Sequence, residues 1–260
     1  MAFQAEHILY DGISSERFGL TLFNENGGLE ETGGTSFSIL RSSLRGGQEF
    51  VYMGKEDADP IPMELSLISD TVLDSAMQGA IHKWLIGHSG YKELRIMQAD
   101  MTTLRIGCIF HELKYLQVGN DTVGVVAIGE CNSRYYRGND IASSASGASG
   151  SFTIRNLSDI NEYIYPEVRI TMPSGGGNFS LVNETDNGRE SVFTSLSGEE
   201  QITLYNFRQI IESSSGIRRL SAFNKKWVRI LPGVNNFSFA FTGGAGRIEI
   251  TMPVYKMVSQ

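Results

Sequence analysis

The sequence has few of the residue types that covalent frameworks and metal sites require. Its 260 residues include two cysteines, Cys108 and Cys131, and four histidines. Two cysteines without a C-x-x-C spacing cannot build a disulfide framework. Both lie in strand-like segments, so we expect two buried thiols in a protein that folds in a reducing cytoplasm. A bridge between neighbouring strands is the alternative.

Catalytic motifs are also missing. The histidines show no H-E-x-x-H or comparable ligand spacing, and no serine lies in a G-x-S-x-G elbow. The glycine-rich stretches 173–178 (PSGGGN) and 242–246 (TGGAG) lack the Lys-Ser/Thr of a phosphate-binding loop, and no helical pattern follows them. They predict tight turns between strands. We therefore expect no enzyme, no cofactor and no metal.

Long apolar runs are absent. No stretch approaches the ~18–20 residues of a membrane helix, and MAFQAEHILY lacks the basic and apolar regions of a signal peptide. We expect neither a secretion signal nor membrane insertion. What the sequence does contain is 41% hydrophobic residues and 29 glycines against six prolines. This mixture, with few helical patterns, predicts a mainly β protein with many turns.

The acidic excess is confined to one half of the chain. Residues 1–138 hold 11 basic and 18 acidic residues, so 11 − 18 = −7, whereas residues 139–260 hold 11 of each. An acidic surface repels nucleic acid at long range. Ordinary solubility charge is the alternative interpretation.

Composition divides the chain into two domains. The stretch 138–151 (GNDIASSASGASGS) has no large side chain after Ile141, and small side chains bury too little area to offset backbone ordering. We predict a domain at 1–138, a flexible linker at 139–151 and a domain at 152–260. Residues 24–50 carry paired glycines at three points and predict a long exposed arm that docks onto a neighbour.

The first domain should combine strands with one helix. Alternating apolar residues predict strands at 63–67 and 104–110, and the second of these should form a hairpin through the turn at 119–121. An apolar stripe at helical spacing lies within 69–90 and consists of Leu73, Met77, Ile81, Trp84 and Leu85. Ser69 or Asp70 should cap the start of this helix, and Gly87 its end in a left-handed conformation.

The second domain shows no helical pattern. Short strand candidates alternate with Gly, Pro and Asn turns, which is typical of a β-sandwich. Trp227 in KKWVRIL should lead a strand and pack in the core, and stacking on a sugar is its alternative role.

Several stretches, in this order along the chain, resemble the distal tail proteins (Dit) of long non-contractile-tailed bacteriophages (siphophages). Asp11–Leu20 (DGISSERFGL) resembles the turn near the start of that family, and 81–85 (IHKWL) is similar to the end of its single helix. The strand closing on 129–136 (GECNSRYY) is similar to the last strand of its N-terminal domain. Residues 197–216 and 219–239 resemble its C-terminal pattern, which includes W-x-R-L-x-P-G-x-N. Tyr205 departs from that pattern, because many relatives carry Asp before the Asn; this implies a changed turn.

The resemblance implies a fold and a role. The N-terminal domain would be a β structure with one helix that assembles into a hexameric ring, and the C-terminal domain a galectin-like β-sandwich outside it. The ring would join the tail tube to the tail-tip hub protein at the distal end of the virion tail, and receptor-binding proteins could dock on it. The chain would be made in the host cytoplasm.

A ring at this place would let DNA pass through its lumen. We hypothesise that Glu30, Glu31, Asp57 and Asp59 face the lumen, where like charge keeps DNA from sticking. The alternative function is a carbohydrate-binding module for host-surface recognition. Against it, residues 139–260 contain no histidine and no H-x-N-P-R motif.

Overall fold

The computed structural model describes residues 6–23, 38–43, 50–56 and 61–258. The chain divides into two compact units, one of residues 1–137 with 256–260 and one of residues 138–255. We call them the first and the second unit and describe each by itself. Both are built mainly from strands, as expected, and the described residues contain one α-helix.

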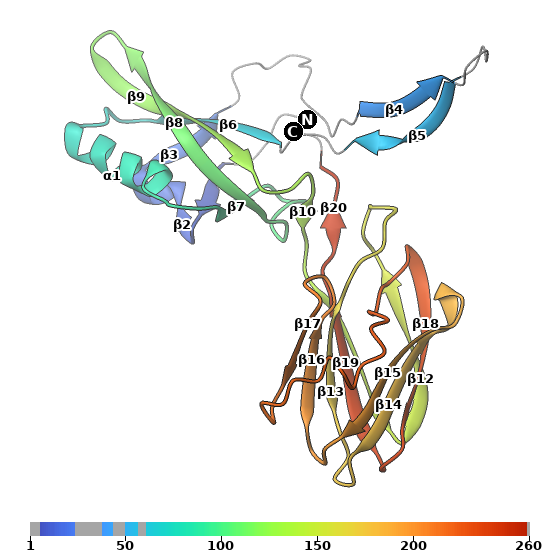
Figure 1. The fold of residues 1–260 in the computed structure, drawn as a ribbon. Coiled ribbons are helices and arrows are strands. Elements are labelled where there is room, and N and C mark those ends of the chain that lie inside the picture. The colour runs from blue at the N-terminus through green and yellow to red at the C-terminus, as the bar shows by residue number, and fades with distance from the viewer. Residues whose placement is uncertain (1–5, 24–37, 44–49, 57–60, 259–260) are drawn as a thin grey trace. The chain divides into compact units, whose positions relative to one another are not determined.

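A seven-stranded antiparallel sheet with the order β2-β1-β7-β8-β9-β6-β3 is the body of the first unit (Figure 1). Its strands are β1 (Ile8–Tyr10), β2 (Ile13–Ser14), β3 (Leu20–Phe23), β6 (Pro62–Ser69), β7 (Lys92–Ile96), β8 (Ile106–Val118) and β9 (Asp121–Cys131). Two short strands, β10 (Tyr136–Arg137) and β20 (Tyr255–Lys256), precede and follow the second unit along the chain.

The core of the first unit lies between one face of this sheet and the helix. Of the alternating residues of the predicted strands, Leu104 is only partly buried and precedes β8, and the others are buried there: Met63, Leu65, Leu67, Ile106, Cys108 and Phe110. β8 and β9 form the expected hairpin, and Gly119 occupies its turn with φ +63°. The period-2 pattern therefore located these strands correctly, because only one face of each is covered by the helix.

Helix α1 (Ser75–Ile86) lies along the covered face of the sheet. The predicted stripe is confirmed within the helix, since Ile81, Trp84 and Leu85 are buried and Met77 packs against them. Leu73, its first predicted member, is buried but precedes the helix. The predicted N-cap is wrong, whereas Gly87 is the C-cap as predicted but without the left-handed conformation. The N-cap is Asp74, whose carboxylate accepts a hydrogen bond from the Met77 amide at 2.7 Å. Neither Ser69 nor Asp70 can do this, because the backbone becomes helical only after residue 74.

Gly87 ends the helix for a different reason from the predicted one. Its φ is −70°, so no left-handed conformation is needed. A Cβ at this position would lie 2.4 Å from the Lys83 carbonyl oxygen, which receives the Gly87 amide hydrogen bond. The glycine is required by close backbone approach.

We expect Asp74→Ala to lower the free energy of unfolding by about 1 kcal/mol, because it removes the acceptor of an orphan helix amide. Urea denaturation of the full chain measures this change. Asp70→Ala, four residues earlier and exposed, is the matched control and should leave the stability unchanged. An equal loss in the two variants would contradict the assignment of the cap.

Residues 10–22 (YDGISSERFGLTL) form the connection from β1 through β2 and a 3-10 helix to β3. Asp11 and Gly12 both have positive φ and turn β1 into β2, and Ser14 then caps a 3-10 helix (Ser15–Phe18). The buried Ser15 hydroxyl accepts a hydrogen bond from the Ile8 amide at 3.2 Å. Phe18 stacks on Trp84 with ring centroids 4.8 Å apart, so this connection packs against α1.

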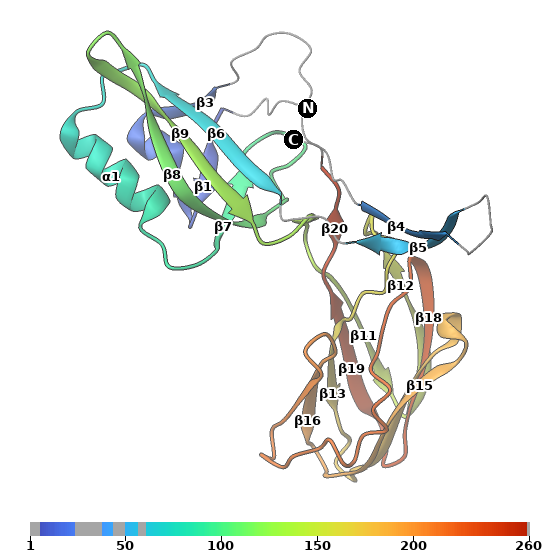
Figure 2. The same cartoon turned by 45° about the horizontal axis from the view of Figure 1, so that its top comes forward.

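The second unit contains two antiparallel sheets whose inner faces share one apolar core. The five-stranded sheet has the order β11-β19-β13-β16-β17, and Figure 2 shows β11 beside β19. Its strands are β11 (Ile141–Gly147), β13 (Glu167–Thr171), β16 (Gln201–Tyr205), β17 (Ile210–Ser213) and β19 (Gly246–Met252). The four-stranded sheet β12-β18-β14-β15 contains β12 (Ser149–Asn156), β14 (Gly177–Asn183), β15 (Arg189–Leu196) and β18 (Gly233–Phe241). This is the predicted β-sandwich.

The predicted linker at 139–151 is wrong. Residues 141–147 are β11 and residues 149–156 are β12, and Gly147, with φ +148°, lies where the chain passes from one sheet to the other. β11 is hydrogen-bonded to β19 and β12 to β18. Ladder hydrogen bonds order this segment, so its stability does not depend on large side chains.

The prediction for 24–50 is also corrected where the structure describes it. Residues 38–43 form a strand, β4 (Ser38–Ser43), which pairs with β5 (Phe50–Glu56) in a two-stranded sheet of its own. Paired glycines suggested a loop, whereas the β-branched and aromatic residues Ile39, Phe50, Val51 and Tyr52 favour this hairpin. Residues 24–37 and 44–49 lie outside the described part.

Candidate functional site

The described residues contain exposed apolar surfaces and buried polar networks. They contain no group of three or more His, Cys, Asp or Glu side chains that could hold a metal ion. No helix among them has the length and apolar character to cross a membrane. Two features are present instead: the exposed apolar hairpin β4–β5 of the first unit, and the buried ion pairs and amide hydrogen bonds of the second unit.

The β4–β5 hairpin exposes large apolar side chains on both faces. Phe50 is 66% exposed, and Tyr52 is 64% exposed. Arg41 lies opposite Tyr52, and its guanidinium stands 5.2 Å from the centre of the Phe50 ring, so these three residues share one face. The other exposed apolar residues of the hairpin are Ile39, Leu40, Val51 and Met53. A two-stranded sheet is marginally stable alone, and an exposed apolar surface of this kind marks an interaction site.

Trp227 does not lead a strand. Residues 224–229 have no regular secondary structure, and the segment is anchored by a bridge between Ile230 and Ile164. The indole is partly buried, packs against the core and meets Phe223 edge-on at 5.0 Å. Val228 and Ile230 in KKWVRIL are buried in the core, so the segment alternates like a strand without forming one. Stacking of Trp227 on a sugar stays an untested prediction.

Arg229, two residues further, is a structural anchor. Its guanidinium donates two hydrogen bonds to the buried Asp186 carboxylate, at 2.7 and 2.9 Å. It also lies 3.9 Å from the centre of the Tyr163 ring, a cation–π contact. The hydrogen bonds to Asp186 raise the pKa of Arg229 above its ordinary value. The pair fixes the irregular segment that carries Trp227 against the 3-10 helix containing Asp186 (Glu184–Asp186).

The buried amides Asn206 and Asn235 complete this support. Asn206 accepts a hydrogen bond from the Val228 amide and donates one to the Pro166 carbonyl, both at 2.7 Å. Asn235 is fully buried, and its side-chain oxygen accepts a hydrogen bond from the Leu231 amide. In this chain the motif W-x-R-L-x-P-G-x-N corresponds to residues 227–235. Its Arg229 and Asn235 side chains hold the irregular segment in place through their hydrogen bonds.

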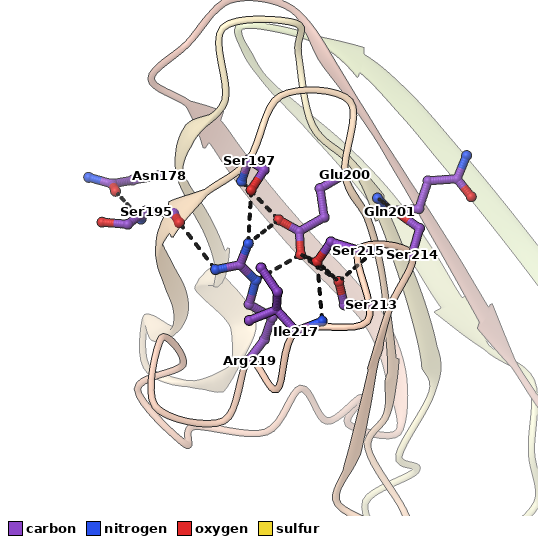
Figure 3. A network of polar contacts seen from close by, with 10 residues as sticks. All are labelled: Asn178, Ser195, Ser197, Glu200, Gln201, Ser213, Ser214, Ser215, Ile217 and Arg219. Carbon is purple, nitrogen blue, oxygen red and sulfur yellow. Dashed lines mark hydrogen bonds and ion pairs between the residues drawn. The ribbon is translucent and has the colours of Figure 1, made fainter.

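A second buried ion pair joins Glu200 and Arg219 (Figure 3). The Glu200 side chain is 1% exposed and the Arg219 side chain 10%. The guanidinium donates to both carboxylate oxygens, at 2.7 and 2.5 Å, and also to the Ser197 hydroxyl at 3.0 Å. The hydroxyls of Ser213 and Ser215 donate to the same carboxylate, and so does the Ser197 amide. The network pins the loop after β17 to the turn before β16.

Two opposing effects set the pKa of Glu200. Burial alone would raise it, but the hydrogen bonds from Arg219, the two serine hydroxyls and the Ser197 amide together lower the pKa from 4.5 to about 2. A carboxylate with a depressed folded-state pKa stabilises the fold above its unfolded pKa. That contribution is roughly 3 kcal/mol, and it is lost as the pH falls from about 4.5 to about 2.

The stability of the second unit should therefore fall steeply between pH 4.5 and pH 2. Urea denaturation at several pH values measures this slope. Glu200→Gln should be less stable at pH 6 and should show a shallower slope within the same window, because its side chain cannot ionise. An identical slope in the variant and the original chain would mean that Glu200 does not carry this dependence.

His88 and His7 have different partners. His88 is hydrogen-bonded to the Trp84 carbonyl at 2.7 Å and meets Tyr10 edge-on, at the end of the helix. His7 lies 3.7 Å from Glu16 in the connection from β1 to β3. The acids that we placed in a lumen, Glu30, Glu31, Asp57 and Asp59, lie outside the described residues. Their position stays a prediction.

Comparison with known proteins decides the family. A family model described as "Phage tail protein N-terminal domain" matches residues 3–133, and "Phage tail C-terminal domain" matches residues 135–252. The chain belongs to this family of phage tail proteins. No curated protein sequence matches it. The boundary between the two models falls close to the boundary between the two units.

The fold of this phage tail protein is similar to that of solved phage structures. The Dit protein of phage SPP1 matches with a TM-score of 0.70 and 11% identity, over 95% of this chain and 98% of the other. SPP1 Dit is described as a paradigm of the hub adsorption apparatus in phages that infect Gram-positive bacteria. The baseplate of phage p2 in its activated conformation, with Ca or with Sr, matches with TM-scores of 0.47 and 0.46, at 8% and 10% identity and 95% coverage of this chain. The match to SPP1 Dit confirms the predicted Dit fold.

Sequence reasoning missed both buried ion pairs of this phage tail protein. Glu200 and Arg219 are 19 residues apart, and Asp186 and Arg229 are 43 apart. No local spacing connects residues at such separations. The one available signal was a basic cluster, since two of its members, Arg219 and Arg229, form these pairs; the cluster consists of Arg218, Arg219, Lys225, Lys226 and Arg229.

Proposed function

We propose that this phage tail protein is a structural hub at the distal end of the tail, where six copies form a ring between the tail tube and the tail-tip protein. The observation that carries the proposal is the match to SPP1 Dit, because it extends over both units and nearly the whole of each chain. A single shared domain would support far less, since one fold serves many functions. The proposed role is architectural and contains no catalytic step.

The β4–β5 hairpin supports assembly into a ring. Exposed apolar side chains on both faces need a covering surface, and a neighbouring copy in a closed ring supplies one at a fixed position. Phe50 and Tyr52 are of the kind that anchor protein interfaces. In this proposal the first unit forms the ring, and the acids Glu30, Glu31, Asp57 and Asp59 line a lumen that DNA crosses without binding.

The second unit would stand outside the ring as a galectin-like sandwich on which receptor-binding proteins dock. The protein would be made in the host cytoplasm and would act in the virion. Its sandwich is held by buried ion pairs and amides, which suits a rigid support.

Gold-labelled antibodies against the chain test the location on virions of the phage that encodes it. Electron microscopy should show the label at the tail end that is remote from the capsid. Label on the capsid, at the neck or along the tail shaft would overturn the hub proposal. This result is independent of the number of copies in the ring.

A further inference from the structure

Cys108 and Cys131 stand directly opposite each other on neighbouring strands of the first unit. They are paired in the register of β8 and β9. The next pair along the ladder is hydrogen-bonded, since the Asn132 amide donates to the Gly107 carbonyl at 2.9 Å. The Cys131 amide points the other way and donates to the Ile61 carbonyl at 2.9 Å. The cysteines therefore occupy a non-hydrogen-bonded site of the antiparallel ladder.

This type of site has the spacing that a disulfide requires. Opposed Cα atoms at non-hydrogen-bonded sites lie about 4.5 Å apart, and disulfides join Cα atoms roughly 4.4–6.8 Å apart. Residues that lie directly opposite each other in an antiparallel ladder project from the same face of the sheet, so both side chains point the same way. Cys108 and Cys131 are the only cysteines in the sequence, so neither has another intramolecular partner.

Both thiols are reduced in this structure, and burial shields them from oxidants in solution. Both residues are buried with no exposed area. The hydrogen bond that the Cys108 thiol donates to Cys131, together with burial, raises the pKa of the Cys108 thiol well above its usual range. Thiolate is the reactive form, so oxidation of the folded chain should be slow at neutral pH and faster in alkaline buffer.

We propose that Cys108 and Cys131 are a latent crosslink, which forms an intramolecular disulfide between β8 and β9 when the protein passes into an oxidising medium. A virion protein makes this passage when it leaves the host cell, and that setting, unlike the chemistry of the pair, rests on the proposed function. In the reaction two S–H bonds break and one S–S bond forms. The two protons and two electrons pass to a small two-electron oxidant, such as the N=N bond of a diazene, which becomes a hydrazine.

Treatment of the purified full-length chain with diamide at alkaline pH tests the chemistry. After denaturation in an alkylating reagent, intact-mass measurement should show a monomer that has lost two hydrogens and carries no alkyl group. A proteolytic digest should contain one linked pair of peptides, from β8 and β9. Two alkylated cysteines after prolonged oxidation, or crosslinked dimers in place of the internal bond, would overturn the proposal.

The consequence for stability gives an independent readout. A bridge that closes a hairpin of this length should raise the melting midpoint of the first unit by roughly 5–10 °C, because it restricts the unfolded chain. Dithiothreitol should reverse the shift. Cys131→Ala is the control, since it removes one thiol without adding a polar group, and diamide should not raise its midpoint. A lower midpoint in the oxidised original chain would show that the sheet does not accommodate the bridge.

The same mass measurement on purified virions separates this proposal from the hub function. A disulfide in the isolated chain, together with free thiols in virions, would contradict the proposed use of the pair and leave the hub assignment intact. Loss of the hub assignment would leave the reaction of the isolated chain unchanged.

Discussion

Replacing Arg219 with methionine is expected to lower the free energy of unfolding of the second unit by about 3–5 kcal/mol, because the change leaves the Glu200 carboxylate buried without its counter-charge. The Glu200 side chain is 1% exposed and cannot recover the lost hydrogen bonds from water. Urea denaturation with hydrogen–deuterium exchange mass spectrometry measures the effect, since it follows peptides of the second unit separately from those of the first.

Two further variants make this expectation specific. Arg218→Met alters the exposed neighbouring arginine and should change stability by less than about 0.5 kcal/mol. The double variant Glu200→Met/Arg219→Met removes both charges and should recover most of the loss, because it leaves no uncompensated buried charge. A loss below about 1 kcal/mol for Arg219→Met alone would show that Glu200 finds another partner or reaches solvent.

Substituting aspartate for both Phe50 and Tyr52 on the β4–β5 hairpin is expected to abolish ring assembly. Interface aromatics of this kind contribute about 2–4 kcal/mol each, and buried aspartates would add a desolvation cost. A closed ring repeats the defect at every interface, so the loss multiplies. Light scattering should then report the monomer mass for the variant under conditions where the original chain assembles.

Phe207→Asp is the matched control for the hairpin variant. Phe207 is 79% exposed in the turn between β16 and β17 of the second unit, so the chemical change is the same at a site that the ring does not use. This control should assemble normally. Unchanged assembly of the hairpin variant would remove the hairpin from the interface. Loss of amide protection in the seven-stranded sheet of that variant would instead indicate unfolding.

The fold was predictable where local chemistry and tertiary packing agree. The β8–β9 hairpin has alternating side chains and a glycine with positive φ in its turn, so pattern and structure coincide. The stripe on α1 was predictable for the same reason, since one helix face meets one sheet face. The cap was not, because Ser69, Asp70 and Asp74 are all suitable residues and only the backbone path selects among them.

Segments that depend on distant partners were not predictable. The Gly/Ser/Ala stretch 138–151 looks like a linker until β18 and β19 supply its hydrogen bonds, and these strands lie about a hundred residues later in the chain. Trp227 lies in an irregular segment held by Asn206, Asp186 and Ile164, which come from three separate regions. Hydrogen bonds and ion pairs between residues so far apart in the chain produce no hydrophobic periodicity that could be recognised in the sequence.

Whether six copies of this chain form a ring is tested by the solution mass of the purified protein, measured by light scattering over a range of concentrations. The monomer is 28.7 kDa. We expect a discrete species of about 172 kDa, which is six times the monomer mass, or twice that mass for two stacked rings. A single species of 28.7 kDa at every concentration would contradict it.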